Sequence, residues 1–186
     1  VKPHGDAVRY DLLPKPPHFE PKAKAMISLF MMGGPSQMDL FDPKPMLTKY
    51  DGQKFPGEIK YDNLAQASAK VFGSPWKFEP RGQCGMELSE LLPKLSEVAD
   101  DITLIRSMQS GVSNHQQGLF AMNNGRITGG RPSLGSWLTY GLGTENENMP
   151  GFVTISPSLG NGGPRNYGNA FLPAIYAALV GPTPGV

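Results

Sequence analysis

The sequence predicts an α/β domain in which helices flank a mostly parallel sheet. Its 186 residues, 39% of them hydrophobic, are enough for one domain with a core. The apolar run 25–32 stops at Gly33-Gly34-Pro35, which is typical of a strand buried on both faces and followed by a sharp turn. A second apolar run, 102–105, comes after a helical pattern, and a strand, helix, strand unit pairs its strands in parallel.

The first 24 residues are predicted to form an extended N-terminal arm. Proline fixes φ and supplies no backbone N–H, so a proline-rich segment favours neither helix nor sheet. The domain itself is expected over residues 25–186. The five prolines of the arm are Pro3, Pro14, Pro16, Pro17 and Pro21.

Residues 51–85 are predicted to form a long ordered segment outside the sheet, either a lid or an insertion. Glycine and proline are scattered through it, and no helical or strand period is sustained. Five aromatic side chains are expected to pin it by burial, because aromatic rings bury large apolar areas. They are Phe55, Tyr61, Phe72, Trp76 and Phe78.

Later elements follow from hydrophobic periodicity. An apolar stripe from Leu88 to Ala99 predicts an amphipathic helix with Pro93 in its first turn. The β-branched run 102–105 predicts the second strand. Helices are expected near 116–122 and 133–140, and a third strand over 151–155, before a tail rich in glycine and proline after Gly160.

Composition disfavours several classes of function. Lys+Arg 17 against Asp+Glu 16 gives a net charge of +1 without a charged cluster, so no nucleic-acid partner is expected. The longest apolar run is far shorter than the roughly 20 residues that span a bilayer, so no membrane span is expected. A single cysteine, Cys84, rules out an internal disulfide framework and a zinc site built from several thiolates.

Ligands of an open parallel sheet collect outside the carboxyl ends of its strands, which selects two loops. In the first, Gly33 and Gly34 permit close backbone approach, and Ser36 and Asp39 offer a hydroxyl and a carboxylate. The same residues suit a plain turn and helix cap, and the sequence does not separate these interpretations.

The second loop follows the run 102–105 and carries Asn114 and His115. A histidine there can serve as nucleophile, general base or metal ligand, or can simply be exposed. Arg106 and Arg131 can clamp an anion, because a guanidinium matches phosphate or sulfate oxygens in a bidentate fork, or can remain solvated. The working hypothesis is that both loops converge on one anion-sized hollow.

Four blocks of this sequence resemble a bacterial family, domain of unknown function 1501. They are Leu29–Pro45, Gly85–Pro93, Ile105–Met108 leading to Asn114-His115, and Gly130–Trp137. The resemblance implies an alkaline-phosphatase-like fold related to the sulfatases, found mostly in planctomycetes and similar bacteria. It implies an extracytoplasmic protein exported through a leader that this chain does not show. It also implies that the chain is the N-terminal half of a longer protein.

A looser resemblance concerns sulfatases, whose nucleophile precedes a Gly-Arg pair by ten residues. His115 stands at that offset from Gly125-Arg126. With histidine in place of Cys, Ser or Thr, formylglycine chemistry is excluded. The superfamily also places a metal-binding Asp at the end of its first strand, where this chain has Met32-Gly33, so Asp39 is the nearest carboxylate for a divalent metal.

The sequence therefore leaves two functions open. In the first, a hydrolase of phosphate or sulfate esters uses His115 as nucleophile or metal ligand and Asn114 to orient a small-molecule or glycan ester. Arg106 or Arg131 would neutralise the anion, and Ser36 would help to bind it. In the second, a non-catalytic protein of the same fold binds a glycan or an anion, or serves as a structural part of the cell surface. The sequence specifies neither the metal nor the oligomeric state.

Overall fold

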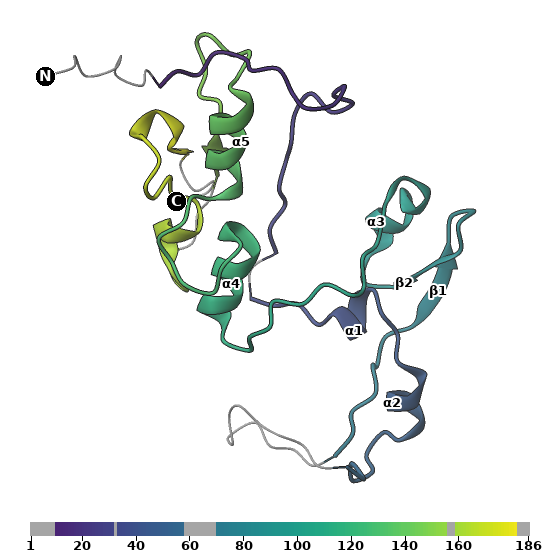
Figure 1. Ribbon diagram of the computed structural model, residues 1–186. Helices are drawn as coiled ribbons and strands as arrows, with labels where there is room; N and C mark the ends of the chain where they lie inside the picture. The colour runs from purple at the N-terminus through teal and green to yellow at the C-terminus, as the bar shows by residue number, and fades with distance from the viewer. Residues whose placement is uncertain (1–9, 32, 58–69, 156–158, 182–186) are drawn as a thin grey trace, which may run out of the picture. The chain divides into compact units, whose positions relative to one another are not determined.

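The computed structural model describes residues 10–31, 33–57, 70–155 and 159–181 (Figure 1). The chain divides into two units, one formed by residues 1–28 and 110–186 and the other by residues 29–109. The described residues form five α-helices, three 3₁₀ turns and two sheets of two strands each. Each unit has its own buried side chains, so each is described by itself.

The first unit is built around two helices, α4 (His115–Asn124) and α5 (Leu134–Leu142). Each helix has a side-chain cap at its start, because Asn114 accepts from the N–H of Gln117 and Ser133 accepts from the N–H of Ser136. A glycine with positive φ ends each helix, Gly125 at +74° and Gly143 at +73°. Both helices confirm the predictions near 116–122 and 133–140.

Shorter elements cover these two helices. The 3₁₀ turn η3 (Gly163–Asn166) contacts α4, and η4 (Ala174–Tyr176) contacts α5. Strand β3 (Val153–Thr154) pairs in parallel with β4 (Leu179–Val180). The strand predicted over 151–155 is therefore present only as two residues.

The core of the first unit is small and rich in aromatic rings. Its buried apolar side chains among the described residues include Phe120, Pro132, Leu172 and Tyr176. Tyr176 meets Tyr140 edge to face at 5.3 Å and Tyr10 at 6.3 Å between ring centroids, geometries that aromatic pairs favour. Tyr10 comes from the predicted N-terminal arm.

The described part of the predicted arm, residues 10–24, contains no helix or strand. Part of it is nevertheless hydrogen-bonded to the rest of the first unit. The N–H of Lys15 donates to the carbonyl of Leu142, and the N–H of Thr144 donates to that of Leu12, both over 2.9 Å. The hydroxyl of Tyr176 donates to the carbonyl of Asp11 at 3.0 Å.

The second unit centres on an antiparallel hairpin, β1 (Phe78–Arg81) with β2 (Met86–Ser89), in which Phe78 pairs with Ser89 and Arg81 with Met86. Leu88 and Ser89 are buried there together with Ala99. The unit also contains short helical turns, which are α1 (Gln37–Leu40), α2 (Pro45–Lys49), α3 (Pro93–Ser96) and η2 (Ala99–Asp101).

One carboxylate fixes the hairpin turn. Asp100 accepts hydrogen bonds from the backbone N–H groups of Gln83 at 2.9 Å and Cys84 at 2.8 Å. These backbone donors, that of Gln83 first, hold the pKa of Asp100 below its ordinary value, because they favour the charged form. Gly82 and Gly85 flank the turn with φ of +65° and +67°.

The prediction of a mostly parallel, alkaline-phosphatase-like sheet flanked by helices is wrong for the described residues. The run 25–31 forms no strand, and Ile27 and Leu29 are 83% and 87% exposed. The run 102–105 forms no strand either, and Ile105 is exposed. Met32 lies outside the described residues. A strand is stabilised by hydrogen bonds to a neighbour, and neither run has such a neighbour in the described part of the chain.

Two further expectations are corrected. The single helix expected from Leu88 to Ala99 is replaced by β2, α3 and η2, although Pro93 does occupy the first position of α3. The burial of aromatic side chains expected in 51–85 is wrong for Phe55, Phe72 and Trp76, which are exposed. Tyr61 lies outside the described residues.

Candidate functional site

The start of α4 carries Asn114 and His115. Asn114 is the N-cap with extended backbone (φ −75°, ψ 128°), and its side-chain oxygen accepts from the N–H of Gln117 at 3.2 Å. The N–H groups of His115 and Gln116 have no acceptor among the described residues. Unpaired N–H groups at a helix start, together with the helix dipole, attract anions.

His115 is the first residue of α4, and its side chain is exposed. The imidazole makes no hydrogen bond or ion pair with any described residue. It can therefore rotate freely beside the unpaired N–H groups and offer a ring nitrogen to a bound anion. A catalytic nucleophile or base is usually held in place by a third group, and none of the described residues does this for His115.

Arg131 belongs to the first unit but lies at the other end of α4. Its carbonyl accepts from the side-chain amide of Asn124, the last residue of the helix, at 3.1 Å. Ten residues of α-helix separate the two ends, about 14 Å along the axis. The structure therefore does not bring Arg131 and His115 to the same end of the helix.

Arg106 belongs to the second unit and faces a carboxylate there. Its guanidinium lies 3.9 Å from Asp42, which also pairs with Lys44 at 2.7 Å. One carboxylate is thus shared between two cations. An anion that bound to Arg106 would therefore compete with Asp42 for the guanidinium group.

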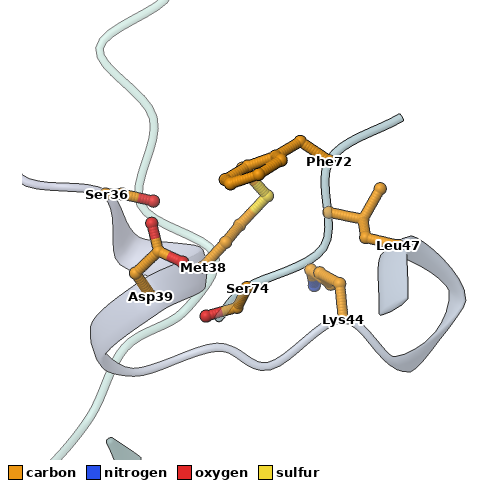
Figure 2. Close-up of a pocket in the computed structure, with 7 residues that line it drawn as sticks. All are labelled: Ser36, Met38, Asp39, Lys44, Leu47, Phe72 and Ser74. Carbon is orange, nitrogen blue, oxygen red and sulfur yellow. The ribbon is translucent and has the colours of Figure 1, made fainter. Parts of the chain in front are cut away.

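Ser36 and Asp39 line the same hollow of about 250 Å³ in the second unit. Ser36 precedes α1 without making a side-chain cap, and Asp39 lies in the first turn of that helix. Figure 2 shows both oxygen-bearing groups on one side of the hollow, while Met38 extends toward Phe72 on the other. The polar groups predicted for an anion and a metal therefore border a hollow with an apolar wall.

The metal expected at Asp39 would need further ligands. Divalent metals in proteins take several carboxylate, imidazole or water ligands. The described residues contain no group of three or more His, Cys, Asp or Glu side chains arranged to hold a metal ion. The divalent metal expected at Asp39 stays a prediction.

The loop with Ser36 and Asp39 belongs to the second unit, and the segment with Asn114 and His115 belongs to the first. The common hollow expected between these loops stays a prediction. Each half of the predicted site has its own local geometry, a polar rim on a hollow at α1 and an open helix start at α4.

Comparison with protein families bears on these candidate residues. A family model described as protein of unknown function (DUF1501) matches residues 23–185. The chain belongs to the DUF1501 family. The match includes every candidate residue from Ser36 to Arg131. No curated protein and no solved structure matches the chain.

The DUF1501 match also covers side chains that sequence reasoning did not select. Asn124 is buried and connects two loops, and Lys49 and Trp76 border a second hollow. Among these residues, only Trp76 has a signal in the sequence, because it is an aromatic residue between Pro75 and Lys77, but the sequence predicts that its side chain is buried.

The helices of the described residues are all too short or too polar to span a membrane.

Proposed function

We propose that this DUF1501 chain binds the phosphate or sulfate group of an ester at the start of α4. The observation that carries the proposal is the exposed His115 beside two backbone N–H groups without acceptors in the described structure. The N–H groups would donate hydrogen bonds to the anion's oxygens, and the imidazole would add a third donor when protonated. Asn114 keeps the helix start open to the ligand, because its side chain engages only Gln117.

A relationship to sulfatase-like proteins is part of the proposal. The ten-residue spacing from His115 to Gly125 corresponds to one uninterrupted helix, which ends at Gly125 with a hydrogen bond from its N–H to the carbonyl of Ala121. A helix of this length presents its N-terminus to the ligand and its Gly-Arg pair at the opposite end. This supports descent from a sulfatase-like ancestor through this segment.

Hydrolysis of the bound ester is the second candidate function. It is favoured by the accessibility of the His115 imidazole, whose neutral form could attack a phosphorus or sulfur atom held by the adjacent N–H groups. The ester oxygen would leave with a proton as the alcohol when the bond to the imidazole nitrogen forms, and water would then cleave that bond to release phosphate or sulfate. Binding alone is favoured by the lack of any orienting partner for that imidazole in the described structure. We rank binding first, because it needs only the groups that α4 already presents.

Calorimetric titration with sulfate, phosphate, 4-nitrophenyl sulfate and 4-nitrophenyl phosphate tests the proposal. We expect His115→Ala to weaken anion binding by about tenfold, the loss of one charge-assisted contact. His18→Ala, which removes an exposed histidine of the N-terminal segment, is the matched control and should bind as the parent does. Equal affinity of the parent and His115→Ala would refute binding at this helix start.

The same nitrophenyl esters distinguish hydrolysis from binding. Release of nitrophenol by the parent and not by His115→Ala would establish the second candidate. Retained binding without release would establish the first. The parent and His115→Ala should be assayed in the same buffer at the same pH.

A further inference from the structure

The second unit contains another hollow, larger and more open than the one at α1. Its volume is about 460 Å³, and it lies between the Pro43–Pro45 segment with α2 and the chain that leads into β1. Two aromatic rings, two prolines and two lysines line most of its wall. These are Trp76, Phe78, Pro43, Pro45, Lys44 and Lys49.

Trp76 is the wall residue with the most accessible aromatic face. The residue is 43% exposed, and its ring stacks on no other aromatic ring among the described residues. The other tryptophan of the chain behaves differently, because Trp137 packs edge to face against Tyr140 and Phe171, both at 5.9 Å. The two tryptophans are similarly exposed, Trp137 at 41%, and they differ in that only the Trp76 ring has no aromatic neighbour among the described residues.

The charge on the hollow is positive. No carboxylate lines it among the described residues. Lys44 is paired with Asp42, but Lys49 has no carboxylate partner in the described chain and lies over the ring of Tyr50, 5.5 Å from its centroid. Arg106 also pairs with Asp42, so two cations share this one carboxylate.

We propose that this hollow binds an anionic sugar, that is, a saccharide that carries sulfate or carboxylate groups. A sugar ring has an apolar face of C–H groups that stacks on an exposed indole, and the flanking prolines extend the apolar wall. The anionic substituent would pair with Lys49 at the rim. The hydroxyls of Thr48 and Ser74, which also line the hollow, would bond to the sugar's hydroxyl groups.

This inference does not depend on the proposed function at α4. The two sites are carried by different units, and they share no residue. A sulfated saccharide could engage either one by its anionic group, but only the hollow offers an aromatic platform for the ring.

The two tryptophans allow a direct test by fluorescence. In Trp137→Phe the remaining indole is Trp76, and in Trp76→Phe it is Trp137. Titration with sulfated dextran oligosaccharides should change the emission of Trp137→Phe and leave that of Trp76→Phe unchanged. By calorimetry, Trp76→Phe should retain most of the affinity and Trp76→Ala should lose about tenfold of it, the scale of one aromatic contact.

The charge is tested by a pair of lysine variants. Lys49→Gln should weaken binding several-fold, whereas Lys94→Gln, which changes an exposed lysine on α3, should not. Unsulfated dextran of the same length should bind weakly, and sodium sulfate alone should leave the emission of Trp76 unchanged. Equal weakening by both lysine variants, or an emission change confined to Trp137, would overturn the proposal. His115→Ala should bind the oligosaccharide at this hollow as the parent does, which separates the two sites.

Discussion

The side-chain amide of Asn124 donates to the carbonyl of Arg165, 41 residues away along the chain, at a distance of 2.7 Å. The same nitrogen donates to the carbonyl of Arg131 at 3.1 Å. Asn124 ends α4, Arg131 precedes α5, and Arg165 lies in η3. One buried amide thus joins three segments of the first unit, which would otherwise be held together by few apolar contacts.

Asn124→Ala should therefore destabilise the first unit. It removes the donor from two partly buried carbonyl groups, and each lost hydrogen bond costs about 0.5–1.5 kcal/mol. The midpoint of urea unfolding should fall accordingly. Asn123→Ala is the matched control on the same helix, because Asn123 bonds only to the carbonyl of Leu119 one turn earlier. A similar loss in both variants would contradict this role for Asn124.

The two glycines of the β1–β2 turn should respond differently to alanine. Both have left-handed backbone, so each substitution costs roughly 1–2 kcal/mol of strain. A methyl group at Gly85 meets nothing within 4 Å, whereas one at Gly82 would lie 2.5 Å from a carboxylate oxygen of Asp100. Gly82→Ala should therefore lower the urea midpoint clearly more than Gly85→Ala does, and equal losses would argue against the contact.

Acid should loosen this hairpin through Asp100. Its pKa is held below the ordinary value by the N–H groups of Gln83 and Cys84. A carboxyl whose pKa is lower in the folded state contributes stability above its unfolded pKa, about 3.9, and loses it as the pH falls through the folded value. Exchange of the Gln83 and Cys84 amide protons should accelerate below about pH 4. Asp100→Asn should lack this acid step, and Asp101→Asn should keep it.

Alkali should release the N-terminal segment through Tyr176. Burial first, and then the charge of Asp11, raises the pKa of Tyr176, whose hydroxyl donates to the Asp11 carbonyl. A raised pKa contributes stability below the unfolded value, about 10, and the contribution is lost as the pH rises through the folded value. Between pH 9 and 11 the parent should lose more stability than Tyr176→Phe. Tyr10→Phe, which keeps the Tyr176 hydroxyl, should behave like the parent.

The helices α4 and α5 could be predicted because their signals are local. Asn114 and Ser133 supply caps, and Gly125 and Gly143 supply stops, all within a few residues of the helices they bound. The run 25–31 illustrates the opposite case. Its apolar residues match a buried strand, but a strand also needs a partner that the run itself does not specify, and the described chain provides none.

The candidate site was predictable to a similar extent. A histidine directly after Asn at a helix start can be recognised from neighbouring residues, and so can a Ser and an Asp after two glycines. The hollow beside Trp76 could not be recognised in this way. Lys49 and Trp76 are separated by 27 positions in the sequence, and only the folded chain brings them to one wall.

The run 25–31 also has a practical consequence. The run has exposed Ile27 and Leu29 side chains, and its backbone N–H and carbonyl groups form no hydrogen bond with any described residue. Such a stretch can add to the edge of another sheet or pair with its own copy in a second molecule. The chain should thus become increasingly prone to intermolecular association as it is concentrated, and a lysine at position 27 would improve its solubility.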